Sequence, residues 1–127
     1  MEYNLLHTCL RVMDLEKAVT FYTEALGFRE THRNDVPDGE FTLVFMTDKA
    51  GTHQIELTYN YHPEKPYVIG DGFSHIAVGT ADLEGSHKRH QEMGYKVGKL
   101  RSLRGGPPGY YFMYDPDGYE VEVCRRK

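Results

Sequence analysis

The sequence predicts an α+β fold built from two paired βαβββ modules, and three observations lead to this prediction. A histidine stands seven residues before an Asp-Leu-Glu triplet twice in the chain. Each copy then runs through a helix-like stretch to a glycine–aromatic pair, and each ends in a strand-like segment that carries a glutamate. Two copies of one segment order at a nearly constant offset indicate a duplicated supersecondary unit. These landmarks are His7 and His75, Gly27 and Gly94, and Glu56 and Glu122.

In the first half, hydrophobic spacing and turn residues give the order of the elements. Residues 5–12 have the alternation of a strand, and Asp14 is a suitable N-cap for the helix that follows. Apolar residues recur at helical spacing as far as Leu26, and Gly27 fits the left-handed position that ends a helix. Three strands separated by turn-forming residues complete the module, at 28–34, 41–47 and 53–59.

The second half repeats this order. Asp115-Pro116-Asp117-Gly118 forms a turn before the last strand, because proline presets φ and glycine accepts a positive φ. The polar segment 61–72 contains two prolines and is interpreted as a linker. The prediction is one domain over residues 1–127, with modules at about 1–60 and 73–127. The elements expected in the second module are strands at 73–80, 96–100, 110–114 and 119–124, with a helix at 83–93.

Length, charge and cysteine content exclude several classes of protein. The chain has 127 residues and a formal net charge of -4, which gives no reason to expect nucleic acid or an anionic membrane as partner. No apolar run approaches the roughly 20 residues that span a bilayer. The N-terminus has no basic region of the kind that precedes a signal peptide. We therefore expect a cytoplasmic protein with Cys9 and Cys124 as free thiols.

The repeated histidines and glutamates fall on one side of their strands. Side chains alternate along a strand, and in all four strands the aliphatic residues share the face opposite the histidine or glutamate. If the sheet faces that the helices do not cover curl around a cleft, two imidazoles and two carboxylates converge. This donor set suits Zn, Ni, Co or Mn. Four protein ligands that leave coordination positions open favour a catalytic ion. The predicted metal ligands are His7, Glu56, His75 and Glu122.

A strand histidine or glutamate is more often an ordinary solvent-facing residue, and only the duplication favours the metal hypothesis here. The remaining histidines show no such repetition. His87 and His90 lie in a charged helical stretch beside Lys88 and Arg89, and we expect both to be solvated.

Several segments taken together resemble the glyoxalase I family (lactoylglutathione lyases) of the vicinal oxygen chelate superfamily. The resemblance covers nearly the whole chain, and the order of its motifs is specific. The segments that carry it are Leu5-Leu6-His7-Thr8-Cys9-Leu10-Arg11-Val12, Ile55-Glu56-Leu57-Thr58-Tyr59-Asn60, Ser74-His75-Ile76-Ala77-Val78 and Asp115-Pro116-Asp117-Gly118-Tyr119-Glu120-Val121-Glu122.

The resemblance implies a metal cleft formed by the paired modules, with the same four ligands and two waters completing an octahedron. A short chain without insertions is similar to the bacterial subgroup activated by nickel or cobalt, with zinc or manganese as alternatives. Arg11 and Asn60 are implied as contacts for glutathione. A homodimer is implied as well, with the cleft built either within one chain or between swapped halves of two.

The implied reaction isomerises the hemithioacetal of methylglyoxal and a thiol to an S-D-lactoyl thioester through an enediolate, which detoxifies methylglyoxal. Glu122 is the expected base, with Glu56 as a second candidate. The segment 70–74 before His75 contains Asp71 and no arginine, whereas some family members place a substrate-binding arginine nearby. The thiol therefore stays open, and Arg101 or Arg104 could supply a cationic contact. Alternatives within the superfamily are a CoA-ester epimerase, a thiol transferase and a dioxygenase. Four ligands argue against the dioxygenase, which uses two histidines and one carboxylate.

Overall fold

The computed structural model describes residues 1–126, and its chain divides into two compact units, one from Met1 to Val68 and one from Ile69 onward. Both units combine one helix with a small sheet, which confirms the α+β class. The first unit contains β1 (His7–Arg11), α1 (Leu15–Glu24), β2 (Arg29–Val36), the 3-10 turn η1 (Pro37–Gly39), β3 (Phe41–Thr47) and β4 (Gln54–Asn60). The second contains β5 (His75–Thr80), α2 (Leu83–Glu92), β6 (Tyr110–Tyr114) and β7 (Glu120–Arg125).

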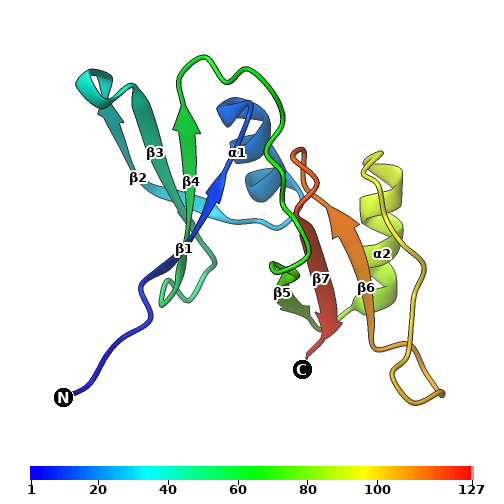
Figure 1. Cartoon of the computed structure of the whole chain (residues 1–127). Helices are drawn as coiled ribbons and strands as arrows, with labels where there is room; N and C mark the ends of the chain where they lie inside the picture. Colours follow the sequence, from blue (N-terminus) through cyan, green and yellow to red (C-terminus); the bar gives the residue numbers. More distant parts are fainter. Residues whose placement is uncertain (127) are drawn as a thin grey trace. The chain divides into compact units, whose positions relative to one another are not determined.

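The four strands of the first unit form one sheet in the order β1-β4-β3-β2 (Figure 1). β1 runs parallel to β4, whereas β4 with β3 and β3 with β2 are antiparallel. α1 contributes the buried side chains of Ala18, Phe21 and Tyr22 to the core. Alternate residues of the central strands are buried as well, among them Val44 and Leu57. Every second residue of these strands therefore lies on the other face, away from the core.

The signals that begin and end α1 act as the sequence predicts. The Asp14 carboxylate accepts a hydrogen bond from the backbone N–H of Lys17 at 3.1 Å and so satisfies one donor at the open helix end. Gly27 has a φ of 69° and donates its N–H to the carbonyl of Thr23 at 3.0 Å. A left-handed residue at this point turns the chain away from the helix axis and into β2.

The sheet of the second unit has the order β5-β7-β6, with β5 parallel to β7 and β6 antiparallel to it. The prediction of a strand over 96–100 is wrong, because these residues form no regular strand. Val97 makes an isolated bridge to Met113 of β6, and Arg101, just after the segment, makes one to Tyr110, with the register shifted by one residue between the two bridges. The shift interrupts the hydrogen-bond ladder as a bulge does. The segment nevertheless lies along β6 in the place that β2 takes along β3.

Helix α2 is unusually polar, with Leu83 as its one aliphatic residue. The expectation that His90 is solvated is wrong, because its side chain is 2% exposed and fills a core position on α2. Its Nδ1 lies 2.7 Å from the Tyr111 hydroxyl, which also lies 2.7 Å from Ser86 Oγ. His87 is half-buried, with Nε2 2.8 Å from the carbonyl of Gly98. Within residues 1–126, no helix is long and apolar enough to cross a membrane.

Substituting Tyr111 by Phe tests this buried network. Burial raises the pKa of Tyr111, which keeps the phenol protonated and able to donate. Removing the hydroxyl leaves His90 and Ser86 without this partner, so the free energy of unfolding should fall by about 1–3 kcal/mol. Urea denaturation followed by circular dichroism measures the change. The matched control is Tyr110→Phe, one residue earlier and only half-buried, which should cost less than about 0.5 kcal/mol. Equal losses in the two variants would contradict a role for the network.

Candidate metal centre

In the first unit, two predicted ligands meet across neighbouring strands. The parallel register of β1 and β4 places His7 opposite Gln54 and Cys9 opposite Glu56. His7 Nε2 consequently lies 3.4 Å from Glu56 Oε2. The two side chains are 39% and 15% exposed, on the face opposite the buried Leu57. This face therefore carries a half-accessible imidazole–carboxylate pair.

The second unit builds the same pair from the equivalent strands. β5 and β7 are parallel, and His75 lies opposite Glu120, two residues before Glu122. In the first unit, His7 likewise lies opposite Gln54, two residues before Glu56. His75 Nε2 lies 3.4 Å from Glu122 Oε1, with side chains 32% and 22% exposed. The repeat in the sequence therefore corresponds to two His–Glu pairs with the same strand register, the same separation and similar exposure.

Each pair also has a phenylalanine that the sequence did not single out. Phe45 meets the His7 ring edge to face, with centroids 5.4 Å apart and planes at 82°. Phe112 meets His75 in the same way, at 5.2 Å and 88°. Both phenylalanines lie directly opposite the glutamate on the adjacent antiparallel strand. A search for equivalent residues in the two halves, extended to β3 and β6, would have found them.

The donor atoms of each pair fit a shared divalent ion. Two donors about 2.1 Å from one ion, at an angle between 90° and 110°, lie roughly 3.0–3.4 Å apart, which matches the 3.4 Å separations. His75 Nδ1 lies 2.7 Å from Ser74 Oγ, and such a contact commonly fixes the orientation of a ligating imidazole. Among residues 1–126, however, no group of three or more His, Cys, Asp or Glu is close enough to hold a metal ion. The structure assembles two pairs, and the set of four stays a prediction.

A thiol accompanies each glutamate. Cys9 and Cys124 are both free cysteines, as predicted. Burial raises the pKa of the Cys9 thiol, and the Glu56 carboxylate adds to this rise. Burial also raises the pKa of Cys124, with a further contribution from its hydrogen bond to Glu122. Both thiols are therefore protonated at neutral pH and can act as weak hydrogen-bond donors.

The two predicted glutathione contacts lie on the strands of the first pair. Arg11 ends β1 on the same face as His7 and is exposed. Asn60 ends β4, where its Nδ2 donates to the Tyr67 hydroxyl at 3.1 Å. Because alternate residues share a face, Arg11 and Asn60 extend the ligand-bearing face of the sheet toward the ends of these two strands.

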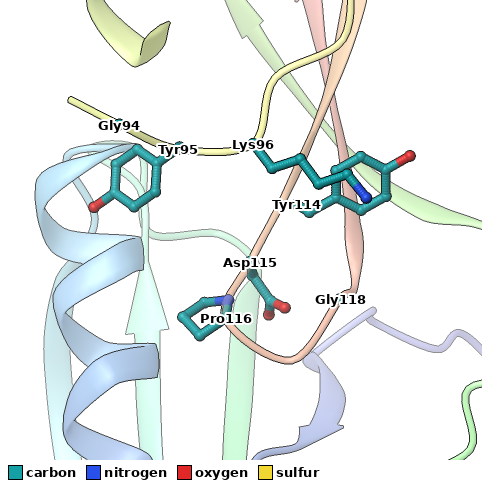
Figure 2. A pocket seen from close by; sticks show the side chains of 7 residues that line it. All are labelled: Gly94, Tyr95, Lys96, Tyr114, Asp115, Pro116 and Gly118. Carbon is teal, nitrogen blue, oxygen red and sulfur yellow. The ribbon is translucent and has the colours of Figure 1, made fainter. Parts of the chain in front are cut away.

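An open pocket of about 330 Å³ lies in the second unit, at the turn before β7 (Figure 2). It contains none of the predicted site residues. The Lys96 ammonium lies 4.5 Å from the centre of the Tyr114 ring, and Asp115 Oδ1 accepts from the backbone N–H groups of Asp117 and Tyr119. The two hydrogen bonds to Asp115 stabilise the turn itself. The lining residues are Gly94, Tyr95, Lys96, Tyr114, Asp115, Pro116 and Gly118.

Comparisons with known proteins identify glyoxalases as relatives of this chain. The model of the Glyoxalase/Bleomycin resistance protein/Dioxygenase superfamily matches residues 4–123. A probable lactoylglutathione lyase of Synechocystis is 38% identical, over 95% of this chain and 94% of the relative. The lactoylglutathione lyase of Neisseria meningitidis is 37% identical, over 97% and 91%. Among solved structures, a trypanothione-dependent glyoxalase I of Leishmania major has a TM-score of 0.86 and 31% identity, over 98% of this chain and 87% of that one. Glyoxalase I of Zea mays has a TM-score of 0.88 and 33% identity, over 97% and 44%.

Proposed function

This chain belongs to the Glyoxalase/Bleomycin resistance protein/Dioxygenase superfamily, and we propose that it acts as a lactoylglutathione lyase. Its reaction isomerises the hemithioacetal of methylglyoxal and a thiol to the S-D-lactoyl thioester. One structural observation supports the proposal most strongly. An imidazole–carboxylate pair is repeated in both units with the same register and the same 3.4 Å separation. A duplicated pair of this kind has no role in packing either core, because it lies on the opposite face of each sheet.

The proposal assigns the two pairs to one divalent metal site. His7, Glu56, His75 and Glu122 would hold the ion, completed either within one chain or between two chains of a homodimer. Imidazole and carboxylate donors suit nickel, cobalt, zinc or manganese. The resemblance of this short chain to the bacterial subgroup of the family favours nickel or cobalt. When bound, such an ion supplies positive charge that stabilises the two neighbouring substrate oxygens as they become negative.

The residues of the chain carry the proton transfer. A carboxylate within hydrogen-bond reach takes the proton from the carbon beside the carbonyl and returns it to the neighbouring carbon. We assign this role to Glu122, with Glu56 facing the substrate from the first unit. The transfer leaves the overall composition of the substrate unchanged, because the proton removed from one carbon is delivered to the next.

The thiol part of the substrate is assigned to the first unit. Arg11 supplies a cation for a thiol carboxylate, and Asn60 supplies an amide that is already ordered by Tyr67. Glutathione is the proposed thiol, as in the names of the bacterial relatives. The trypanothione-dependent enzyme of Leishmania major has the same fold, so other thiols belong in any test. A cytoplasmic location stays a prediction.

An assay with several thiols tests the proposal. Nickel-loaded protein is mixed with methylglyoxal and either glutathione, trypanothione, coenzyme A or cysteine, and thioester formation is followed by ultraviolet absorbance. We expect rapid thioester formation with glutathione and at least about tenfold lower kcat/KM with coenzyme A, which has no carboxylate, since a lost charged contact costs about 1.4 kcal/mol or more. Absence of thioester with every thiol would contradict the proposed reaction.

A further inference from the structure

The two units differ at two positions beside an otherwise repeated pair. The residue two places after the glutamate is Thr58 on β4 and Cys124 on β7, and in both strands it lies on the same face as the glutamate. The residue directly opposite the glutamate on the parallel strand also differs. It is Cys9 in the first unit and Ala77 in the second.

In the first unit these residues form a hydrogen-bonded relay to Glu56. The Thr58 hydroxyl donates to Glu56 Oε1 at 3.1 Å. Cys9 Sγ lies 3.2 Å from the same hydroxyl oxygen. A hydroxyl has one proton, and Thr58 gives it to the carboxylate, so the thiol of Cys9 is the donor to Thr58. The relay holds one carboxylate oxygen of Glu56 while the other faces His7.

Thr58 itself has little freedom to move. It lies on a central strand, paired with Arg11 of β1 on one side and Leu43 of β3 on the other. A β-branched side chain on such a strand is also restricted at χ1. The hydroxyl is thus fixed by the sheet before any ligand binds.

In the second unit Glu122 has a weaker partner. Cys124 offers it a thiol, which is a poor donor compared with a hydroxyl. Ala77, opposite Glu122, has no polar atom in its side chain with which to extend a relay. Two glutamates in matching positions are therefore held to different degrees.

We propose that Thr58 is a positioning residue that keeps Glu56 a fixed metal ligand, and that Cys124 at the equivalent position leaves Glu122 free to move during proton transfer. The inference rests on the proposed function. It deepens that function by giving a structural reason why two equivalent carboxylates take unequal roles.

The first test measures metal affinity and not turnover. Thr58→Val keeps the branched shape and removes the hydroxyl. In metal-free full-length protein, competition with a chromogenic chelator should show nickel binding about 10–100-fold weaker in this variant, the usual cost of losing a group that orients a ligand. Thr58→Ser restores the hydroxyl and should return the affinity to within about threefold of the wild type.

Thr8→Val is the matched control, because Thr8 is a strand threonine on the opposite face of neighbouring β1, hydrogen-bonded to His53. Its nickel affinity should stay within about twofold of the wild type. Unchanged affinity in Thr58→Val, or equal losses in Thr58→Val and Thr8→Val, would overturn the proposal. If the wild-type protein binds nickel but lacks lyase activity, the proposed function fails. The affinity comparison still tests the role of Thr58 in that case.

The reciprocal variant tests the second unit. Cys124→Thr gives Glu122 the hydroxyl donor that Glu56 has. Nickel affinity should stay equal or rise, whereas kcat should fall at least about fivefold with KM changed less than twofold, since a more firmly held carboxylate is a poorer base. An unchanged kcat together with intact nickel binding would overturn the assignment of mobility to Glu122.

Discussion

Replacing Glu122 by Gln is expected to lower kcat by about 10²–10⁴-fold while the protein stays folded and still binds nickel. The range is that of a lost general base. Glutamine keeps the size of the side chain and one oxygen that can face His75, so the strand and its contacts with β5 and β6 need not change. What disappears is the group that can accept a carbon-bound proton. Steady-state assay of nickel-loaded protein, with nickel content measured on the same sample, gives the result.

The matched control is Glu120→Gln on the same strand and the same face. Glu120 carries the same charge and accepts a hydrogen bond from the Tyr114 hydroxyl at 3.2 Å, but it is not assigned to the metal or the proton. Its kcat should stay within about threefold of the wild type. A Glu122→Gln protein with bound nickel and near-full activity would contradict the assignment of Glu122 as the base.

The sequence predicted which face of each strand carries the histidine or the glutamate, for a simple physical reason. Alternation along a strand separates aliphatic from polar residues, so each histidine and glutamate could be assigned to the face away from the core. The repeat then indicated which strands were equivalent. Elements bounded by strong local signals also agree with the structure, as Asp14 and Gly27 show at the two ends of α1.

Features that depend on tertiary contacts were not predictable in this way. Nothing in the residues 96–100 indicates the one-residue shift that breaks their pairing with β6. His90 is buried against the Tyr111 hydroxyl, which lies 21 residues away in the sequence. The relay from Cys9 through Thr58 needs the register of β1 against β4, and a slip by two residues would keep the same alternation of buried and exposed side chains.

Metal removal should abolish activity without unfolding the protein. Dialysis against a strong chelator is expected to lower turnover below about 1% of the loaded enzyme, because the charge that stabilises the negative substrate oxygens is lost. The cores of both units should persist, since the pairs lie on the faces opposite Leu57 and Val121. The far-ultraviolet circular dichroism spectrum should therefore stay unchanged. Nickel or cobalt should restore more activity than zinc.

Thermal unfolding provides a readout that does not depend on activity. An ion at 100 times its dissociation constant stabilises the folded state by about 2.7 kcal/mol, so nickel should raise the melting temperature of the wild type. His7→Ala and His75→Ala should each reduce that rise, because each removes one donor from a different pair. A rise lost only in His7→Ala would place the ion on the first pair alone and contradict the set of four. Turnover that survives rigorous metal removal would contradict the proposed role of all four residues as ligands of a catalytic metal ion.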